Sequence, residues 1–201
     1  MDKNTLELLA PARDLATGID AINCGADAVY IGAEHFGARS GAANTVSDIG
    51  KLAAHAHRYH AKVYAAVNTI FNDEELPRAH QLICNLWKAG ADAVIIQDMG
   101  LLEMDLPPIP LIASTQAHCT TPEKALFLEK AGFKRVILAR ELSLEEIKAI
   151  RAKTTVELES FVHGALCTSY SGNCYMSYVI GGRSGNRGEC AQPCRKLYTL
   201  T

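Results

Sequence analysis

The sequence lacks several features that would assign it to a class of protein. No stretch approaches the roughly 18 consecutive apolar residues that a membrane helix needs, and the first residues lack the basic-then-apolar order of a secretory signal. The net charge of −2 provides no general attraction for nucleic acid or a membrane surface. We therefore expect a cytoplasmic protein without a membrane partner, in which any contact with nucleic acid is made by a local patch.

Sequence motifs of hydrolytic enzymes are also missing. The chain has neither a Gly-x-Ser-x-Gly elbow nor a His-Glu-x-x-His helix. Cys167 and His163, four residues apart, are the one pair that resembles a nucleophile with its base. A peptidase that uses this pair is therefore kept as an alternative.

A repeated alternation of strands and helices is present instead. Short apolar runs, as expected of parallel strands buried on both faces, alternate with amphipathic stretches. The spacing predicts strands at Leu6–Ala10, Ala28–Ile31, Lys62–Asn68, Ala93–Gln97, Leu111–Ser114, Arg135–Ala139 and Val156–Val162, with helices at Asp14–Cys24, Val46–Tyr59, Glu74–Ala89, Pro122–Ala131 and Leu144–Ala152.

A weak internal repeat indicates how these units are arranged. Cys24–Val29 matches Ala89–Val94, and Ala131–Val136 resembles both, each combining a helix end, a tight loop and a strand start. Such repetition is typical of an α/β fold of the (β/α)8 TIM-barrel type. We predict an incomplete barrel of about seven strands over residues 1–164, followed by a Cys/Gly/Arg-rich tail over residues 165–201. Because an eighth strand is missing, we expect an N-terminal fragment of a longer protein.

Polar residues directly follow the predicted strands, at the end where barrel enzymes place their active sites. This set comprises Glu34, His35, Arg39, Asn68, Gln97, Asp98, Ser114, Gln116, His118, Arg140, Glu141 and His163. Within it, the candidate catalytic residues are Arg39, Asn68, Gln116, Arg140 and His163.

Four of the seven cysteines lie close together in the tail, at Cys167, Cys174, Cys190 and Cys194. Thiolates select zinc or iron–sulfur clusters. Zinc sites usually have about two to four residues between paired cysteines, and only Cys190 and Cys194 have that spacing. The wider spacings favour an iron–sulfur cluster, with structural zinc as the alternative metal.

The tail is also locally basic. Its cations are interleaved with tyrosines and opposed only by Glu189, a composition that suits RNA bases and phosphates. The same cations could instead neutralise a negatively charged cluster. The candidate RNA-binding residues are Arg183, Arg187, Arg195 and Lys196.

The chain resembles the collagenase-like peptidase family. The resemblance is carried by Glu159–Cys167, Tyr170–Ser177, Gly182–Ser184 and Asn186–Arg195, and it extends to Glu7–Ala12 and Gly25–Gly32. Within the family, the chain is most similar to members that form 5-hydroxycytidine in large-subunit ribosomal RNA. The stretches that carry this second likeness are Phe36–Arg39, Gln97–Gly100, Ala113–Gln116 and Leu138–Leu142.

This resemblance implies an RNA hydroxylase with a [4Fe–4S] cluster and prephenate as co-substrate, acting on ribosomal RNA or its precursor. Cys167, Cys174 and Cys190 match family ligand positions, while Cys194 competes with a later cysteine that some longer relatives use. We assign Arg39 and Arg140 to the carboxylates of a prephenate-like ligand, and Asn68 and Gln116 to a base edge. The remaining hypothesis is a non-catalytic module in which a cluster or zinc fixes the tail. The sequence contains no indication of the oligomeric state.

Overall fold

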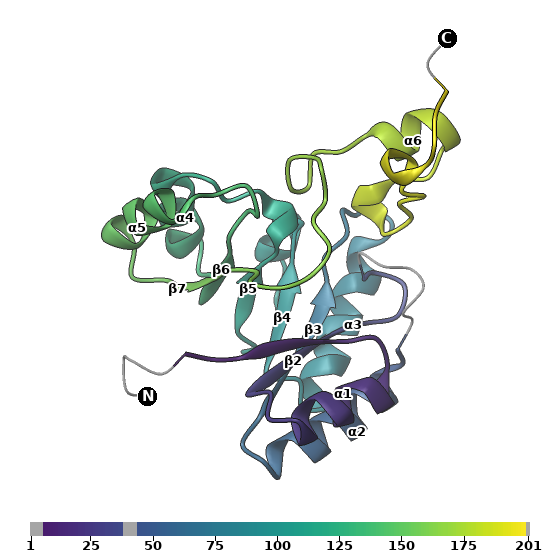
Figure 1. Cartoon of the computed structure of the whole chain (residues 1–201). Coiled ribbons are helices and arrows are strands. Elements are labelled where there is room, and N and C mark those ends of the chain that lie inside the picture. The colour runs from purple at the N-terminus through teal and green to yellow at the C-terminus, as the bar shows by residue number, and fades with distance from the viewer. Residues whose placement is uncertain (1–5, 38–43, 200–201) are drawn as a thin grey trace.

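A seven-stranded parallel sheet forms the centre of the molecule (Figure 1). The computed structural model describes residues 6–37 and 44–199. The spatial order of the strands equals their sequence order, so each strand pairs with the next. This confirms the predicted α/β barrel-type fold with seven strands. The strands are β1 Leu9–Ala12, β2 Ala28–Gly32, β3 Lys62–Val67, β4 Ala93–Ile96, β5 Leu111–Ala113, β6 Arg135–Ile137 and β7 Glu157–Glu159.

Helices cover the outer face of the curled sheet (Figure 1). Four of the helices begin where a side chain accepts a hydrogen bond from a free backbone N–H, at Asp14, Thr45, Thr121 and Ser143. Ser143 and Glu146 form the reciprocal hydrogen bonds of a capping box. The helices are α1 Leu15–Asn23, α2 Val46–His57, α3 Leu76–Lys88, α4 Pro122–Lys130, α5 Leu144–Lys153 and α6 Met176–Gly181. No helix in the described ranges is long and apolar enough to cross a bilayer.

The connection between β4 and β5 departs from the repeat. It contains a short 3-10 helix, η1 (Met99–Glu103), where the other crossovers of the barrel carry an α-helix. Three prolines at positions 107, 108 and 110 follow it, and proline lacks the N–H that a continuing helix needs. The flank of the barrel between α3 and α4 is therefore covered more thinly than the other flanks.

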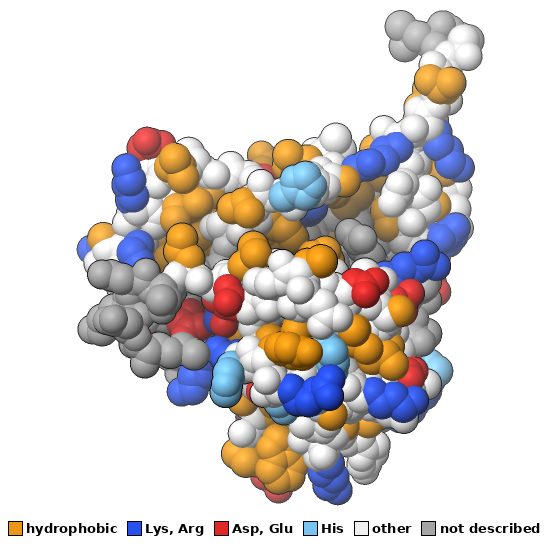
Figure 2. Space-filling model, turned by 60° about the horizontal axis from the view of Figure 1, so that its bottom comes forward, with side chains coloured by type: hydrophobic (Ala, Val, Ile, Leu, Met, Phe, Trp, Pro, Cys, Tyr) orange, Lys and Arg blue, Asp and Glu red, His pale blue; other side chains and the backbone are white. Residues whose placement is uncertain are grey.

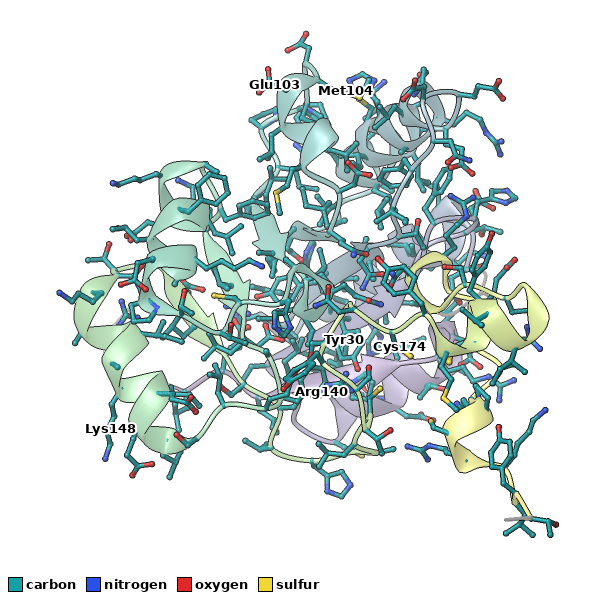
Figure 3. The ribbon with its side chains drawn as sticks, turned by 90° about the horizontal axis from the view of Figure 1, so that it is seen from above. Tyr30, Glu103, Met104, Arg140, Lys148 and Cys174 are labelled. Carbon is teal, nitrogen blue, oxygen red and sulfur yellow. The ribbon has the colours of Figure 1, made fainter. Side chains whose placement is uncertain are left out.

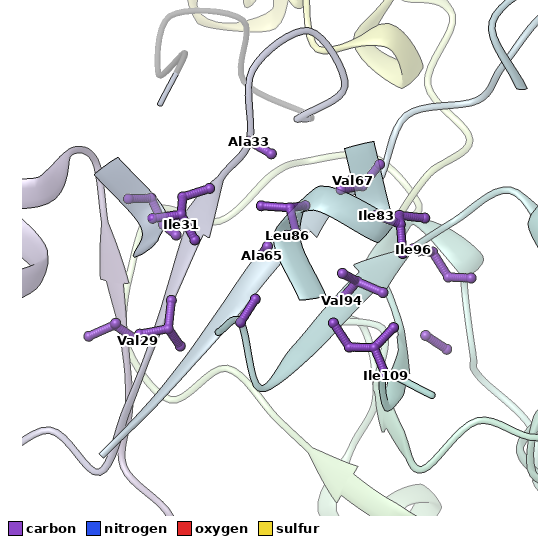
Figure 4. Close-up of a cluster of buried hydrophobic side chains, with 14 of the residues drawn as sticks. Val29, Ile31, Ala33, Ala65, Val67, Ile83, Leu86, Val94, Ile96 and Ile109 are labelled. Atoms are coloured by element: carbon purple, nitrogen blue, oxygen red, sulfur yellow. The ribbon is translucent and has the colours of Figure 1, made fainter. Parts of the chain in front are cut away.

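Successive residues of each strand face opposite sides, which produces two apolar layers. Val29, Val94 and Ile96 belong to the same buried cluster as Ile83 and Leu86 of α3, on the outer side of the sheet (Figure 4). A second cluster, which includes Tyr64, Ala66, Ile95, Ile112 and Ile137, fills the inside of the barrel. The polar residues that follow the strands are thereby placed above a packed interior.

An ionic cluster lies at the opposite, N-terminal end of the interior. Arg135 of β6 contacts Glu7 at 2.5 Å, Glu157 at 2.7 Å and Glu159 at 3.5 Å, and its guanidinium lies 5.2 Å from the centre of the Tyr64 ring. Glu7 precedes β1, whereas Glu157 and Glu159 belong to β7. Arg135 thus links the two edge strands, which form no pair with each other within the described part of the sheet.

The surface seen from the lower side carries intermingled charged and apolar side chains (Figure 2). Basic side chains are most numerous along the tail, at the upper right of that view. No broad surface of one charge covers the barrel on this face, which agrees with the net charge of −2.

Both edge strands differ from the predicted ranges. Pairing of β1 begins only at Leu9, and Leu6 and Leu8 are exposed. The last pair of β7 is Ile137 with Glu159, so the chain beyond Glu159 has no strand beside it, and Val162 is exposed. Both predicted ranges were based on apolar character alone. At the edge of a sheet, the extent of a strand depends on the length of the one neighbouring strand with which it pairs.

Candidate active site

A hydrogen-bond network joins the C-terminal ends of β3, β4 and β5. The buried Ser114 hydroxyl accepts from Asn68 Nδ2 at 3.1 Å and from the backbone N–H of Gln116 at 3.2 Å. Gln97 Nε2 donates to the Gln116 carbonyl at 3.4 Å. Two predicted site residues, Asn68 and Gln116, are therefore held on either side of Ser114. Ser114 belongs to the polar set that follows the strands, but it is not among the candidate catalytic residues predicted from the sequence.

Arg140 follows β6 and reaches the cysteine-bearing loop. It is half-buried, and its Nε has no hydrogen-bond partner among the described residues. Figure 3 labels Arg140 in the view of the barrel from above. Hydrogen bonds from Ser169, and then the charge of Arg140, lower the pKa of the Cys167 thiol. Arg140 and Cys167 are thus brought together.

The other two predicted catalytic residues do not join this group. His163 is exposed in the loop after β7, and no hydrogen bond connects it to Cys167 in the described part of the chain. Arg39 lies outside the described residues. The pairing of Cys167 with His163 that hydrolysis would need is therefore absent from this geometry.

The tail is fixed to the rim of the barrel at a first anchor, formed by Ser171 and Gly172. Glu141 accepts from the Ser171 backbone N–H at 2.6 Å and from its hydroxyl at 2.9 Å, and His118 Nδ1 donates to the Ser171 carbonyl at 3.0 Å. Gly172 has φ +74°, and a Cβ at this position would overlap the Gln116 carbonyl. Only glycine fits so close an approach of two backbones.

A second anchor holds the tail to the loop before α3. Arg187 donates to both carboxylate oxygens of Glu75, at 2.6 and 2.9 Å, and to the Ile70 carbonyl at 3.1 Å. The Ile70 N–H donates to the Asn186 carbonyl at 3.3 Å. The paired guanidinium lowers the pKa of Glu75 to about 2. Arg187, predicted to bind RNA, is here engaged with a carboxylate of the protein.

The other basic residues of the tail remain exposed. Arg183 Nε donates to the Glu189 carbonyl and Arg195 Nη2 to the Leu166 carbonyl, both at 2.9 Å. These contacts use one donor group of each guanidinium and leave the others directed to solvent. Lys196 is exposed as well. RNA binding by these three cations stays a prediction.

The four tail cysteines carry free thiols but are not gathered into one site. Cys167, Cys190 and Cys194 are exposed, and Cys174 is half-buried. The Cys190 Cβ and the Cys174 backbone carbonyl both lie within 4 Å of a Cβ added at Gly185, and no group of three His, Cys, Asp or Glu side chains in the described ranges is placed to hold a metal ion. The donor chemistry suits a soft metal, whereas the present arrangement of the sulfurs does not form its site.

Comparison with known proteins relates the whole chain to one family. A family model described as peptidase family U32 matches residues 13–201. The chain is 54% identical over 200 residues to the 23S rRNA 5-hydroxycytidine C2501 synthase of Escherichia coli, covering 100% of this chain and 31% of that protein. It is 37% identical to the tRNA hydroxylation protein P1 of Bacillus subtilis (96% and 47% covered) and 33% identical to a collagenase of Porphyromonas gingivalis (100% and 51% covered).

A solved structure supports the fold. The U32 peptidase Mk0906 superposes with a TM-score of 0.65 at 19% identity, covering 80% of this chain and 70% of that one. The chain spans about a third of the length of the first curated relative and about half of the other two.

Proposed function

The chain belongs to peptidase family U32, and from that membership we propose that it carries the catalytic barrel of an enzyme that hydroxylates a pyrimidine base in RNA. The observation that supports this most strongly is the 54% identity, along the full chain, to a 23S rRNA 5-hydroxycytidine synthase. Relatives named as tRNA hydroxylation proteins point to the same class of reaction. The proposed substrate is therefore a cytidine of large-subunit ribosomal RNA or of its precursor.

The rim network provides groups that can hold a base. Asn68 and Gln116 carry carboxamides, which both donate and accept hydrogen bonds, as the edge of cytosine does. Ser114 fixes Asn68 through its side chain and Gln116 through its backbone. A base turned out of its stack and placed over Ser114 is thus held by residues of two different strands.

Arg140 provides the binding group for a small carboxylate. Its unpartnered Nε and half-buried position suit a guanidinium that pairs with a ligand carboxylate. Prephenate is the proposed co-substrate, with Arg39 as the second cation. In this role the two arginines bind and orient the ligand at the rim. A carboxylate of the ligand accepts a hydrogen bond from Arg140 Nε.

Cys167, Cys174, Cys190 and Cys194 are the residues that would hold a [4Fe–4S] cluster. When bound, such a cluster supplies one-electron chemistry or a Lewis-acidic iron. Support for the cluster comes from the thiolate donor set and from the lowered pKa of Cys167, while the sulfurs must move together to form the site. Structural zinc remains the alternative occupant.

The proposal is tested by genetic complementation. The complete gene that contains this sequence is expressed in Escherichia coli lacking its 5-hydroxycytidine C2501 synthase, and 23S rRNA nucleosides are measured by mass spectrometry. We expect wild type and Lys148→Ala, an exposed control, to restore 5-hydroxycytidine, whereas Asn68→Ala and Arg140→Ala lower it at least tenfold. Unmodified RNA with the wild-type gene would reject this substrate.

A metal assay separates the alternatives for the tail. Iron, zinc and sulfide are measured on anaerobically purified protein, and four iron with four sulfide per chain is the expected result. Stoichiometric zinc without sulfide would favour the non-catalytic module. A protease assay with Cys167→Ala addresses the remaining hypothesis, because cleavage that disappears in this variant and survives metal removal would favour a peptidase.

A further inference from the structure

A groove lies on the flank of the barrel beside α4. It occupies the place where the β4–β5 connection contains η1 in place of an α-helix, and its volume is about 430 Å³. Gln97 and Gln116, at its inner end, belong to the rim network, and Phe127 and Lys124 of α4 form its outer part. The groove is therefore continuous with the candidate active site.

The outer part of the groove presents an aromatic ring to solvent. Phe127 is 61% exposed and Ile70, which also lines the groove, is 40% exposed, while Leu128 is fully buried. An exposed phenylalanine ring provides a flat face on which a nucleic-acid base stacks, whichever base it is.

A cation stands next to this ring. Lys124 precedes Phe127 by three residues on α4, so both side chains project from the same face of the helix. Within the described residues, no carboxylate forms an ion pair with Lys124. Asp98 also lines the groove, but its carboxylate accepts the backbone N–H groups of Phe71 and Gly100, both at 2.9 Å.

The inner end carries an unsatisfied acceptor. Gln97 Oε1 is buried and has no hydrogen-bond partner among the described residues, while Nε2 of the same carboxamide donates to the Gln116 carbonyl. The last torsion of a glutamine side chain is soft, so a small rotation turns this oxygen toward the groove. The group that would satisfy it is an N–H donor, such as the exocyclic amine of cytosine or adenine.

We propose that this groove binds one nucleotide of single-stranded RNA next to the nucleotide that is modified. The base stacks on Phe127, a phosphate pairs with Lys124, and Gln97 accepts from the exocyclic amine, which favours cytosine or adenine over uracil. This inference rests on the proposed function and extends it, because it assigns a second position of the RNA to Gln97 of the rim network and to Phe127 and Lys124 of α4, which lie outside it.

Binding of fluorescent cytidine and uridine decamers, measured by anisotropy over a series of salt concentrations, tests the groove. We expect Phe127→Ala to weaken binding of the cytidine decamer roughly tenfold, and Phe127→Tyr to retain it, because the ring is kept. Lys124→Ala should reduce the slope of log K against log salt by about 0.7, the value for one phosphate contact. Lys148→Ala, an equally charged change on α5, should leave the slope unchanged.

The decamer pair also tests the role of Gln97. Wild type should bind the cytidine decamer more tightly than the uridine decamer, and Gln97→Leu should remove that preference. A preference that persists in Gln97→Leu would overturn the assignment of this acceptor.

Further outcomes separate this inference from the proposed function. If wild type binds the decamers and both Phe127→Ala and Lys124→Ala bind equally well, the groove is not an RNA site, although the proposed function stands. If wild type binds no RNA, the proposed function loses its support as well. If wild type is a dimer that Phe127→Ala dissociates, a second copy of the chain covers the groove and the RNA assignment is wrong.

Discussion

Gly172 meets a conformational requirement that an L side chain cannot satisfy. Its φ of +74° and its contact with the Gln116 carbonyl leave no room for a Cβ. We expect Gly172→Ala to detach the first anchor, because the backbone would have to move away from the rim. Hydrogen exchange over residues 165–199 should then become faster, while exchange in β2–β5 stays unchanged.

Gly181→Ala is the matched control for this change. No atom of the described part of the chain lies within 4 Å of a Cβ added at Gly181. In Gly181→Ala, hydrogen exchange over residues 165–199 should occur at the wild-type rate. Equal protection of the tail in Gly172→Ala and wild type would show that the first anchor does not hold the tail.

Glu159 should make the protein less stable as the pH rises, whereas most carboxylates in folded proteins have the opposite effect. Burial raises its pKa to about 7, against the nearby charge of Arg135. Because the folded state binds the proton more tightly than the unfolded state, the contribution to stability is present below about pH 4.5 and is lost as the pH rises through 7. Glu159→Gln should therefore raise the melting temperature at pH 8 relative to wild type, and by less at pH 5.

Thermal unfolding at both pH values measures this difference. Glu145→Gln, at an exposed position of α5, serves as the control. A Glu159→Gln variant that melts lower than wild type at pH 8 would contradict the prediction and indicate that the charged pair with Arg135 stabilises the fold.

At the scale of elements, helix α5 begins with a reciprocal cap. Ser143 Oγ accepts from the Glu146 N–H at 3.3 Å, and Glu146 accepts from the Ser143 N–H at 2.7 Å. Ser143→Ala should lower the free energy of unfolding by about 1 kcal/mol, the usual value of a lost N-cap. Urea denaturation measures this free energy. Ser143→Thr keeps a hydroxyl, so it should lower the free energy of unfolding by less than Ser143→Ala. Equal losses in both variants would mean that the hydroxyl is not what stabilises this helix end.

The second anchor joins the tail to α3 through Arg187 and Glu75, and acid should weaken it. The pKa of Glu75 is lowered to about 2 because Arg187 donates to its carboxylate. The stabilisation is therefore complete above about pH 4.5 and is lost as the pH falls toward 2. Limited proteolysis of the tail should be independent of pH between 5 and 8 and faster below 4, whereas Glu75→Gln should be cleaved faster at every pH.

Much of the element pattern could be predicted from the sequence. The five barrel helices and the strands β2, β3 and β4 lie close to their predicted ranges because burial and caps act locally. The range of β7 was too long, since β6 ends at Ile137 and a neighbouring strand is not visible in local composition. Helix α6 was missed, because a six-residue helix in a glycine-rich tail carries no periodic signal.

Part of the candidate site could also be predicted from the sequence. Asn68 and Gln116 follow apolar runs, so their position at the rim could be inferred from local sequence. The pairing of Arg187 with Glu75 joins residues 112 positions apart, and no local pattern indicates it. Basic character alone suggested RNA binding for Arg187, whereas its partner is set by how the tail folds back.

At the scale of the whole molecule, the proposed cluster has a consequence for the tail. Among the described residues no three of the thiols are gathered into one site, so we expect the sulfurs to move together when iron and sulfide are bound. We expect anaerobic reconstitution to protect residues 165–199 from protease, and iron chelation to reverse this. Cys174→Ser should abolish the protection, whereas Cys24→Ser, at an isolated exposed thiol, should keep it. Protection that survives chelation would show that iron does not hold the tail.

The bridge that Arg135 makes between the two edges of the sheet also has a mechanical consequence. A closed barrel resists being pulled open through a ladder of backbone hydrogen bonds, which share the load. Here the load across the gap between β1 and β7 falls on side-chain contacts of one guanidinium with Glu7, Glu157 and Glu159. Under tension we expect β1 and β7 to separate first, while the backbone hydrogen bonds between the strands from β2 to β5 remain intact.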